Sequence, residues 1–371
     1  MSKGLEGVVA ASTAISCVDG MNGRLFYRGI EINELAENSS FEETTALLWY
    51  GKLPTKSQLE SFQQKFNDNR QIPNEVLALM MSMPKRTSPM EVLRTAVSAL
   101  SSYDPEDQDN SLEANVHKSI RLTASMPTIV AAWNRIRNDL WPIPPDKTLG
   151  HAANFLYMLS GKEPEPKAAR ILDIAFILHA DHGLNASTFS ARVTASTLSD
   201  LHSAIVSAIG TLKGPLHGGA NEQVMRMLLE IGEPDRTEQY IRGALATKKK
   251  IMGFGHRVYK ADDPRAAWLQ RLAQDLADAS GDRKWYEISE RVRTLVQASK
   301  PLPVNVDFYS ASVYYTLGIP IDLFTPIFAV SRVAGWTAHV YEQYSDNRLI
   351  RPESEYIGPM DVHYTPIDQR K

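Results

Sequence analysis

Two histidines lie in glycine-rich stretches, where the backbone can approach a ligand closely. His217 stands in the sequence GPLHGGANE, and His256 stands in GFGHRV. Glycine has no Cβ, so it permits close approach and unusual backbone angles. Asn221 is expected to cap a helix that continues through Met225, which places His217 just before a helix N-terminus. The partial positive charge there disfavours imidazolium, so we predict a neutral histidine that donates a hydrogen bond; a glycine-rich turn that happens to contain histidine is the alternative.

Two charged residues lie at predicted helix starts. Asp263 and Pro264 are typical of an N-cap and a first helical position, so Arg265 falls in the first turn. A cation there opposes the helix dipole; a bound carboxylate would offset that cost, and exposure to solvent would make it small. Asp307 follows the extended sequence PVNV and precedes a helix to Leu317. It is predicted either to cap that helix or, between apolar neighbours, to be a partly desolvated and stronger base.

Other polar groups have weaker patterns. His179, Asp181 and His182 raise the possibility of a metal site, but their spacing matches no strong metal template. A hydrogen bond to an anionic substrate and a buried structural role fit these residues equally well. The lysines at 248–250 are placed to meet phosphates, or they form an ordinary solvated face.

A long helix is predicted over residues 325–344, with Thr325 as its N-cap. Arg332, Gly335 and His339 recur at helical spacing and share one face of it. Two arginines that are well separated in sequence can bind two carboxylates of one ligand. The alternative is that they are ordinary surface residues. Two more arginines follow the helix: Arg348 and Arg351.

Helical periodicity dominates the rest of the chain, and strand signals are few. Apolar residues at i, i+3, i+4 and i+7 predict helices over residues 167–180, 199–212 and 264–279. A small hairpin is expected over residues 19–29, and an exposed acidic loop over residues 103–111. Helices are expected to end at four glycines: Gly183, Gly210, Gly232 and Gly318.

Composition narrows the function classes. The 371 residues are 43% hydrophobic and 22% charged, which is typical of a globular protein with a sizeable core. The net charge of −3 gives no reason to expect nucleic acid or an anionic membrane as a partner. Cys17 is the only cysteine, which excludes an internal disulfide and fits a reducing compartment. With no signal peptide or membrane segment recognisable, we expect a cytoplasmic protein.

Taken together and in this order, the motifs resemble those of the citrate synthase family. The strongest match is GFGHRVYKADDPR, and GPLHGGAN, NVD and the Ser331-Arg332 pair add to it. The resemblance covers nearly the whole chain. It implies an all-α fold with a large domain (residues 1–217 and 316–371) and a smaller mobile domain (residues 218–315). It also implies a homodimer whose sites are shared between subunits.

The resemblance further implies an acyltransferase that condenses acetyl-CoA with oxaloacetate and water to give citrate and CoA. Oxaloacetate is expected to close the small domain before acetyl-CoA binds. No metal and no tightly bound cofactor is implied, and the CoA thioester is a co-substrate. The catalytic roles fall on His217, His256 and Asp307. Oxaloacetate is held by His182, Arg265 and Arg332, with Arg351 reaching in from the partner chain. The CoA contact is formed by Lys250, Ile251, Met252, Gly253, Phe254 and Lys260.

Three alternatives remain open on the sequence. A 2-methylcitrate synthase, or a dual enzyme, would use propionyl-CoA with the same residues, because one methylene separates two substrates by only about 1–3 kcal/mol. Leu216 mildly favours the citrate-forming enzyme. A metal-dependent hydrolase would instead be built on His179, Asp181 and His182. A catalytically inactive CoA-binding or scaffold protein is disfavoured, because all three catalytic side chains are present.

Overall fold

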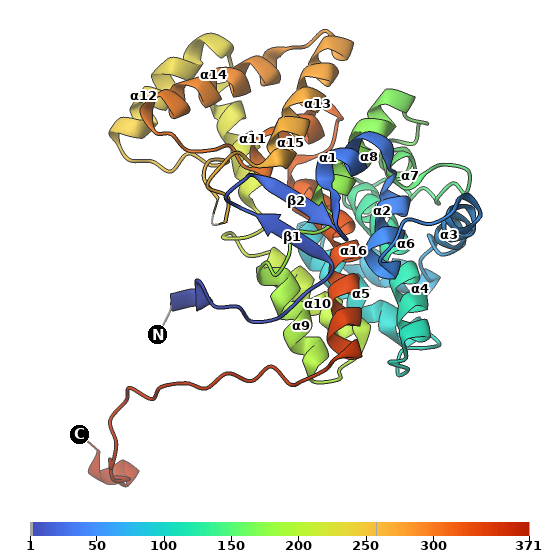
Figure 1. Ribbon diagram of the computed structural model, residues 1–371, viewed down its shortest axis with the longest axis vertical. Helices are drawn as coiled ribbons and strands as arrows, with labels where there is room; N and C mark the ends of the chain where they lie inside the picture. Colours follow the sequence, from blue (N-terminus) through green and yellow to red (C-terminus); the bar gives the residue numbers. More distant parts are fainter. Residues whose placement is uncertain (1–2, 257, 371) are drawn as a thin grey trace.

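The structure, a computed structural model, describes residues 3–256 and 258–370. Helices make up most of it, and one small sheet lies near the N-terminus (Figure 1). Arg257, which belongs to the GFGHRV motif, lies outside the described residues.

The strands and 3-10 helices are short, and the α-helices range in length from 7 to 26 residues. The strands are β1 (Ser16–Asp19), β2 (Arg24–Tyr27) and β3 (Ile30–Glu31). The α-helices of the first half are α1 (Ile32–Asn38), α2 (Phe41–Tyr50), α3 (Lys56–Asp68), α4 (Asn74–Ser82), α5 (Pro89–Leu100), α6 (Leu112–Arg137), α7 (His151–Ser160) and α8 (Pro166–His179). Those of the second half are α9 (Ala186–Ser196), α10 (Leu201–Leu212), α11 (Ala220–Ile231), α12 (Thr237–Ala246), α13 (Pro264–Ser280), α14 (Lys284–Ser299), α15 (Val306–Thr316) and α16 (Phe324–Ser345). The 3-10 helices are η1 (Lys3–Leu5), η2 (Ser101–Tyr103), η3 (Pro234–Arg236), η4 (Ile321–Leu323) and η5 (Ile367–Gln369).

The three strands form one antiparallel sheet in the order β1-β2-β3, which confirms the predicted hairpin. Cys17 pairs with Phe26 in the ladder. Tyr27 at the end of β2 is fully buried, and its hydroxyl donates to the backbone oxygen of Asp181 at 2.8 Å. The sheet is therefore tied to the segment that follows α8.

Helix α16 runs through the middle of the molecule, with α2, α6, α8, α9 and α10 packed around it (Figure 1). The predicted shared face is confirmed, because all three of its residues meet the end of α8 or the residues that follow it. Arg332 Nε donates to the backbone oxygen of His179 at 2.6 Å, and His339 Nε2 lies 3.3 Å from an Asp181 carboxylate oxygen. Gly335 donates its N–H to Ala180 at 3.0 Å, and a Cβ there would lie 2.4 Å from the Ala180 oxygen.

Helices α11 to α15 form a group of their own at the top of Figure 1. Within it α11 and α13 pack on α15, and α12 packs on α14. The group meets the rest of the molecule through α1, α8 and α16. The predicted all-α fold is confirmed, and the sheet contributes little to it.

The helices predicted over residues 167–180, 199–212 and 264–279 are confirmed as α8, α10 and α13. Several predicted ends are wrong. Helix α16 begins before Thr325, whose buried hydroxyl donates to the backbone oxygen of Gly218 instead of capping its own helix. Helix α11 begins at Ala220 with Gly219 in the N-cap position, so Asn221 lies inside it.

The four glycines expected at helix ends behave differently from one another. Gly232 caps α11 with a φ of 74°, and Gly318 follows α15 with a φ of 78°. Gly183 has a φ of 58° but lies four residues beyond the end of α8. Gly210 lies inside α10, so the prediction there is wrong. A glycine ends a helix where its own backbone adopts the left-handed conformation, as Gly232 and Gly318 do.

The loop over residues 103–111 is exposed at most of its positions, as predicted, but Asp104 is held against the body. The side chain of Asp104 is only 3% exposed, and Arg121 donates to both of its oxygens, at 2.6 and 2.8 Å. Lys118 is buried and donates to the backbone oxygens of Asp107 and Asp109. Lys118 and Arg121 on α6 hold part of the acidic loop against the body, which composition alone did not indicate.

Of the helices that the structure describes, none combines the length and the apolar character that crossing a bilayer requires.

Candidate active site

Two motifs that lie fifty residues apart are joined by short backbone pairing. Gly255 donates its N–H to Pro303 at 2.8 Å, and Asn305 donates its N–H to Gly253 at 3.0 Å. The side-chain amide of Asn305 also donates to Gly255 at 3.0 Å. Both glycines have left-handed φ values, 87° and 79°, which side chains disfavour. This pairing brings the histidine of the first motif and the aspartate of the second to the same part of the molecule.

Asp307 is the second residue of α15, and Asn305 is its N-cap, accepting from the Asp307 N–H at 3.1 Å. The prediction that Asp307 itself caps the helix is therefore wrong. The side chain is partly exposed, yet Oδ1 is shielded from solvent and accepts no hydrogen bond from any described residue. Burial raises the pKa of this carboxyl to about 7, although Arg265 lies close enough to lower it. Such a group is available as a base near neutral pH.

His217 lies in the turn between α10 and α11, with Ser187 beside its ring. The Ser187 backbone N–H donates to Nε2 at 3.3 Å, and the Ser187 hydroxyl lies 2.8 Å from the same atom. A ring nitrogen that accepts a backbone N–H carries no proton, so the neutral ring holds its proton on Nδ1. Burial, with help from Arg332, lowers the pKa of His217 to about 4. The ring is therefore a neutral Nδ1–H donor at neutral pH.

His256 has the opposite tautomer. Its Nδ1 accepts from the backbone N–H groups of Val258 and Tyr259, each at 3.0 Å. The proton of the neutral ring must then sit on Nε2. Burial and the nearby Arg265 lower the pKa of His256 to about 4. The site thus contains two neutral histidines, each with its free donor fixed by backbone contacts of the other nitrogen.

His182 lies beside His256, with the two ring centroids 5.2 Å apart and nearly perpendicular. Its Nε2 is 3.2 Å from the hydroxyl of Tyr259. Burial, together with Arg265 and Arg332, holds the pKa of His182 well below its ordinary value. His182 is therefore a third neutral histidine among buried positive charges.

The two predicted arginines are almost fully buried, at 2% exposure for Arg265 and 1% for Arg332. Arg265 is paired in bidentate fashion with Asp263, at 3.0 and 2.8 Å. The carboxylate expected to offset its position in the first turn of α13 is thus supplied by the N-cap of the same helix. Burial lowers the pKa of Arg332 to about 10, and its guanidinium lies 4.6 Å from the centre of the Phe328 ring.

These two arginines differ in their ion pairs. No Asp or Glu side chain among the described residues lies within ion-pair distance of Arg332. Arg265, with its paired Asp263, and Arg332 all act on the carboxyl of Asp307. Because no carboxylate of the described residues pairs with Arg332, its guanidinium is suited to bind an anionic ligand.

The metal site considered at His179, Asp181 and His182 is not formed. His179 Nδ1 bonds to the backbone oxygen of Ala175 at 2.7 Å, and its ring packs edge-on against Phe328. Among the described residues, the group whose ligand atoms lie close enough for a metal is a different one, at the acidic loop and the start of α10: Asp107, Asp200 and His202. The histidine pattern after α8 is thus structural at His179 and part of the site at His182.

The segment predicted to contact CoA borders a cavity of about 320 Å³. Lys250 is exposed there, while Ile251 and Phe254 form part of the apolar lining. Phe254 also packs on Phe308, with ring centroids 4.9 Å apart. The remaining members of the predicted contact are Met252, which is partly buried, Gly253, which is buried, and Lys260, which is exposed. Three more lysines line the cavity: Lys248, Lys249 and Lys300.

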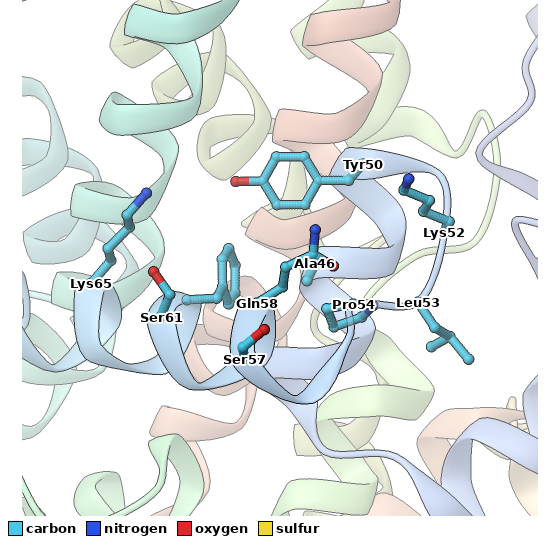
Figure 2. Close-up of a pocket in the computed structure, with 10 residues that line it drawn as sticks. Ala46, Tyr50, Lys52, Leu53, Pro54, Ser57, Gln58, Ser61 and Lys65 are labelled. Carbon is cyan, nitrogen blue, oxygen red and sulfur yellow. The ribbon is translucent and has the colours of Figure 1, made fainter.

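Arg351 is not brought to the site in its own chain. It is exposed in the segment after α16, which runs away from the helical body (Figure 1). A larger cavity of about 500 Å³ lies between α2 and α3, lined by Tyr50, Lys52 and Lys65 among others (Figure 2). None of the predicted site residues lines that cavity.

Comparison with known proteins shows the family to which the chain belongs. Residues 4–353 match the family described as citrate synthase, C-terminal domain. Citrate synthase 2 of Bacillus subtilis is 52% identical over 370 residues, which cover 100% of this chain and 99% of the relative. The chain belongs to the citrate synthase family. The predicted family is confirmed, and so is the enzyme class, a transferase of the citrate synthase type.

Two further relatives bear on the substrates. The citrate/2-methylcitrate synthase of Bacillus subtilis is 45% identical over 359 residues, 96% of each chain. A solved ternary complex of carboxymethyl coenzyme A and oxaloacetate with the citrate synthase of Thermoplasma acidophilum is 33% identical. It superimposes with a TM-score of 0.93 over 100% of this chain and 99% of that one.

Sequence reasoning missed three supporting residues of the site. Ser187 fixes the His217 tautomer, Asn305 caps α15, and Tyr259 contacts two of the histidines. Asn305 and Tyr259 stood inside quoted motifs but were given no role, because a supporting contact leaves no spacing pattern. Ser187 lies thirty residues before its partner, and only the packing of α9 against the His217 turn reveals the contact.

Proposed function

We propose that this citrate synthase family member condenses acetyl-CoA with oxaloacetate at the site formed by His217, His256 and Asp307. The observation that carries the proposal is the pairing of a carboxyl whose pKa is raised to about 7 with two neutral histidines of opposite tautomer. A base alone cannot remove a methyl proton from a thioester, because the proton is far too weakly acidic. Donors aimed at the oxygens where negative charge develops make the step feasible.

In this proposal each catalytic side chain has one task. Asp307 takes the methyl proton of acetyl-CoA, while the Nδ1–H of His217 donates to the thioester oxygen and stabilises the enolate. The enolate carbon attacks the ketone carbon of oxaloacetate. The Nε2–H of His256 polarises that ketone and protonates the alkoxide as it forms, giving citryl-CoA. Water then hydrolyses the thioester to citrate and CoA, which makes the overall reaction favourable.

The substrate-binding roles follow from charge. Oxaloacetate has two carboxylates, and Arg265 and Arg332 are buried guanidinium groups suited to bind them. His182 is proposed as a neutral donor to the same substrate. Arg351 is proposed to reach the site of a second subunit, since it is exposed in the segment that leaves the body of its own chain. This assignment makes the protein a homodimer with shared sites.

The CoA part is proposed to lie along residues 250–254, with Lys260 contributing a further cation. The lysines that line the neighbouring cavity favour a ligand with phosphates. CoA is a co-substrate in this scheme, and no step uses a metal or a tightly bound cofactor. We also propose a cytoplasmic location, which the single cysteine favours.

The proposed mobile domain is residues 218–315, which contains α11 to α14 and all of α15 except Thr316, and residues 1–217 and 316–371 form the large domain. His256 and Asp307 belong to the small domain, whereas His182, His217 and Arg332 belong to the large one. Closure by oxaloacetate would therefore complete the acetyl-CoA site only after the first substrate is bound. Small-angle scattering with and without oxaloacetate tests this idea; an unchanged radius of gyration would contradict it.

Propionyl-CoA is the second candidate co-substrate, because a 45% identical relative is named a citrate/2-methylcitrate synthase. The deciding experiment is CoA release by the purified protein with oxaloacetate, comparing kcat/KM for acetyl-CoA and propionyl-CoA. We expect a preference for acetyl-CoA of at least about tenfold, the lower range for one methylene. Parity or a preference for propionyl-CoA would make it a 2-methylcitrate synthase or a dual enzyme. No release with either thioester would overturn the proposed function.

A further inference from the structure

Tyr259 contacts two of the three site histidines and has no role in the scheme above. It lies in the loop between His256 and α13, and it is only 2% exposed. Its ring centroid is 4.7 Å from that of His256 and 5.5 Å from that of His182. With those two rings 5.2 Å apart, the three side chains form a compact triangle.

The hydroxyl of Tyr259 makes the more informative contact, because it lies 3.2 Å from His182 Nε2. Each group can be either donor or acceptor in principle. Burial raises the pKa of Tyr259 far above its ordinary value, so the hydroxyl keeps its proton at any working pH. Among the described residues, His182 is the only hydrogen-bond partner recorded for this hydroxyl.

A buried hydroxyl that fails to donate loses a hydrogen bond without compensation. If Nε2 carried the imidazole proton, the Tyr259 hydrogen would lack an acceptor. If the hydroxyl donates to Nε2, both requirements are met, and the proton of neutral His182 sits on Nδ1. Since Nε2 faces the tyrosine, Nδ1–H is then the donor left for a ligand.

We propose that Tyr259 is a positioning residue for oxaloacetate, whose hydroxyl fixes His182 as the Nδ1–H tautomer and holds its ring toward the substrate. The inference rests on the proposed function for the role of His182. It assigns each of the three site histidines a tautomer set by a donor on the other ring nitrogen. For His217 that donor is Ser187, for His256 it is the backbone at 258–259, and for His182 it is the Tyr259 side chain.

Tyr259→Phe tests the hydroxyl alone. The backbone N–H that holds His256 remains, and a phenyl ring keeps the packing of the triangle. We expect the KM for oxaloacetate to rise about tenfold, the equivalent of one lost hydrogen bond, with kcat changed by less than about threefold. The matched control is Tyr341→Phe, which removes another buried hydroxyl, bonded to the backbone oxygen of Asn115 at 3.2 Å. Its KM should stay at the wild-type value.

A second measurement reads the tautomer of His182 directly in the wild-type enzyme. Two-bond couplings in ¹⁵N-labelled histidine distinguish the two tautomers, and the His182 signals are assigned by their loss in His182→Gln. We expect Nδ1–H at His182 in the wild-type resting enzyme and a shift toward Nε2–H in Tyr259→Phe. An Nε2–H tautomer in the wild type overturns the proposal, and so does an unchanged KM in a folded Tyr259→Phe.

A double variant separates action through His182 from other effects. If Tyr259 works only through His182, Tyr259→Phe adds no further rise in KM in a His182→Gln background. Two full, additive increases would overturn the assignment. Failure of the proposed function is a distinct outcome, because it appears as absent CoA release in the wild type, whereas the tautomer of the resting enzyme is read without turnover.

Discussion

The pKa values of two aspartates, Asp181 and Asp307, are shifted in opposite directions. Asp181 is fully buried, and one of its oxygens accepts from the Ser16 hydroxyl and from the Gly183 N–H. His339 Nε2 lies 3.3 Å from the other oxygen. Burial raises the pKa of Asp181, but His339, Arg332 and Ser16 outweigh it, and the net shift is downward.

Asp307 has the same carboxyl group but lacks hydrogen bonds of this kind. Its Oδ1 is shielded from solvent and accepts no hydrogen bond from the described residues, so burial prevails and raises the pKa to about 7. Arg332 lies close enough to act on both carboxyls. The difference therefore lies in hydrogen-bond donors: Asp181 has them and is structural, whereas Asp307 is left free to take a proton.

The largest effect is expected on turnover. Asp307→Asn keeps the shape of the side chain but removes the proposed base, so kcat should fall on the order of 10³-fold. Steady-state CoA release gives kcat, and oxaloacetate binding by calorimetry shows that the site is otherwise intact. Turnover within tenfold of wild type would mean that another group is the base.

The matching change at Asp181 is expected to act on stability. Asp181→Asn replaces the buried carboxylate that faces Ser16, Gly183 and His339, and losing a hydrogen bond to a charged group costs about 1.5–3 kcal/mol. Because the folded pKa is lowered, this contribution is present above the unfolded pKa near 3.8 and is lost only as pH falls through the folded value. Urea unfolding at pH 7 and fixed protein concentration measures the loss. A variant as stable as wild type would show that Asp181 is not the anchor of this segment.

Asp307→Asn should have the opposite sign in the same unfolding experiment. A folded pKa near 7 against an unfolded value of 3.8 means that ionised Asp307 destabilises the fold, at about 1.4 kcal/mol per pKa unit. Because Asp307 is partly exposed and solvent weakens the effect, we expect Asp307→Asn to raise the free energy of unfolding by about 2–4 kcal/mol at pH 8. The gain should shrink as pH falls from 7 toward 4. A variant less stable than wild type at pH 8 would contradict the pKa shift.

The sequence predicted one of these aspartates better than the other. Asp307 was predicted to be a base because it stands in a family motif between apolar residues, whereas its predicted capping role belongs to Asn305. For Asp181 the sequence left a metal site, a substrate contact and a structural role open, because its partners Ser16 and His339 lie far along the chain. Periodicity predicted α8, α10 and α13, since local burial patterns fix them. Helix starts such as that of α16 were missed, because Thr325 bonds to Gly218 of another segment.

The pH dependence of kcat/KM also tests the raised pKa of Asp307, and the change expected for each pH unit is the smallest of these effects. Of the three proposed catalytic side chains, only Asp307 has a pKa near 7, since those of His217 and His256 are held at about 4. As pH falls below 7 the base becomes protonated, so kcat/KM should fall by about tenfold per unit, with a slope of one down to about pH 5. Histidines with ordinary pKa values would titrate in the same window and steepen the slope toward two or three. A rate profile from pH 5 to 9 therefore reads directly whether the site holds one titrating group or several.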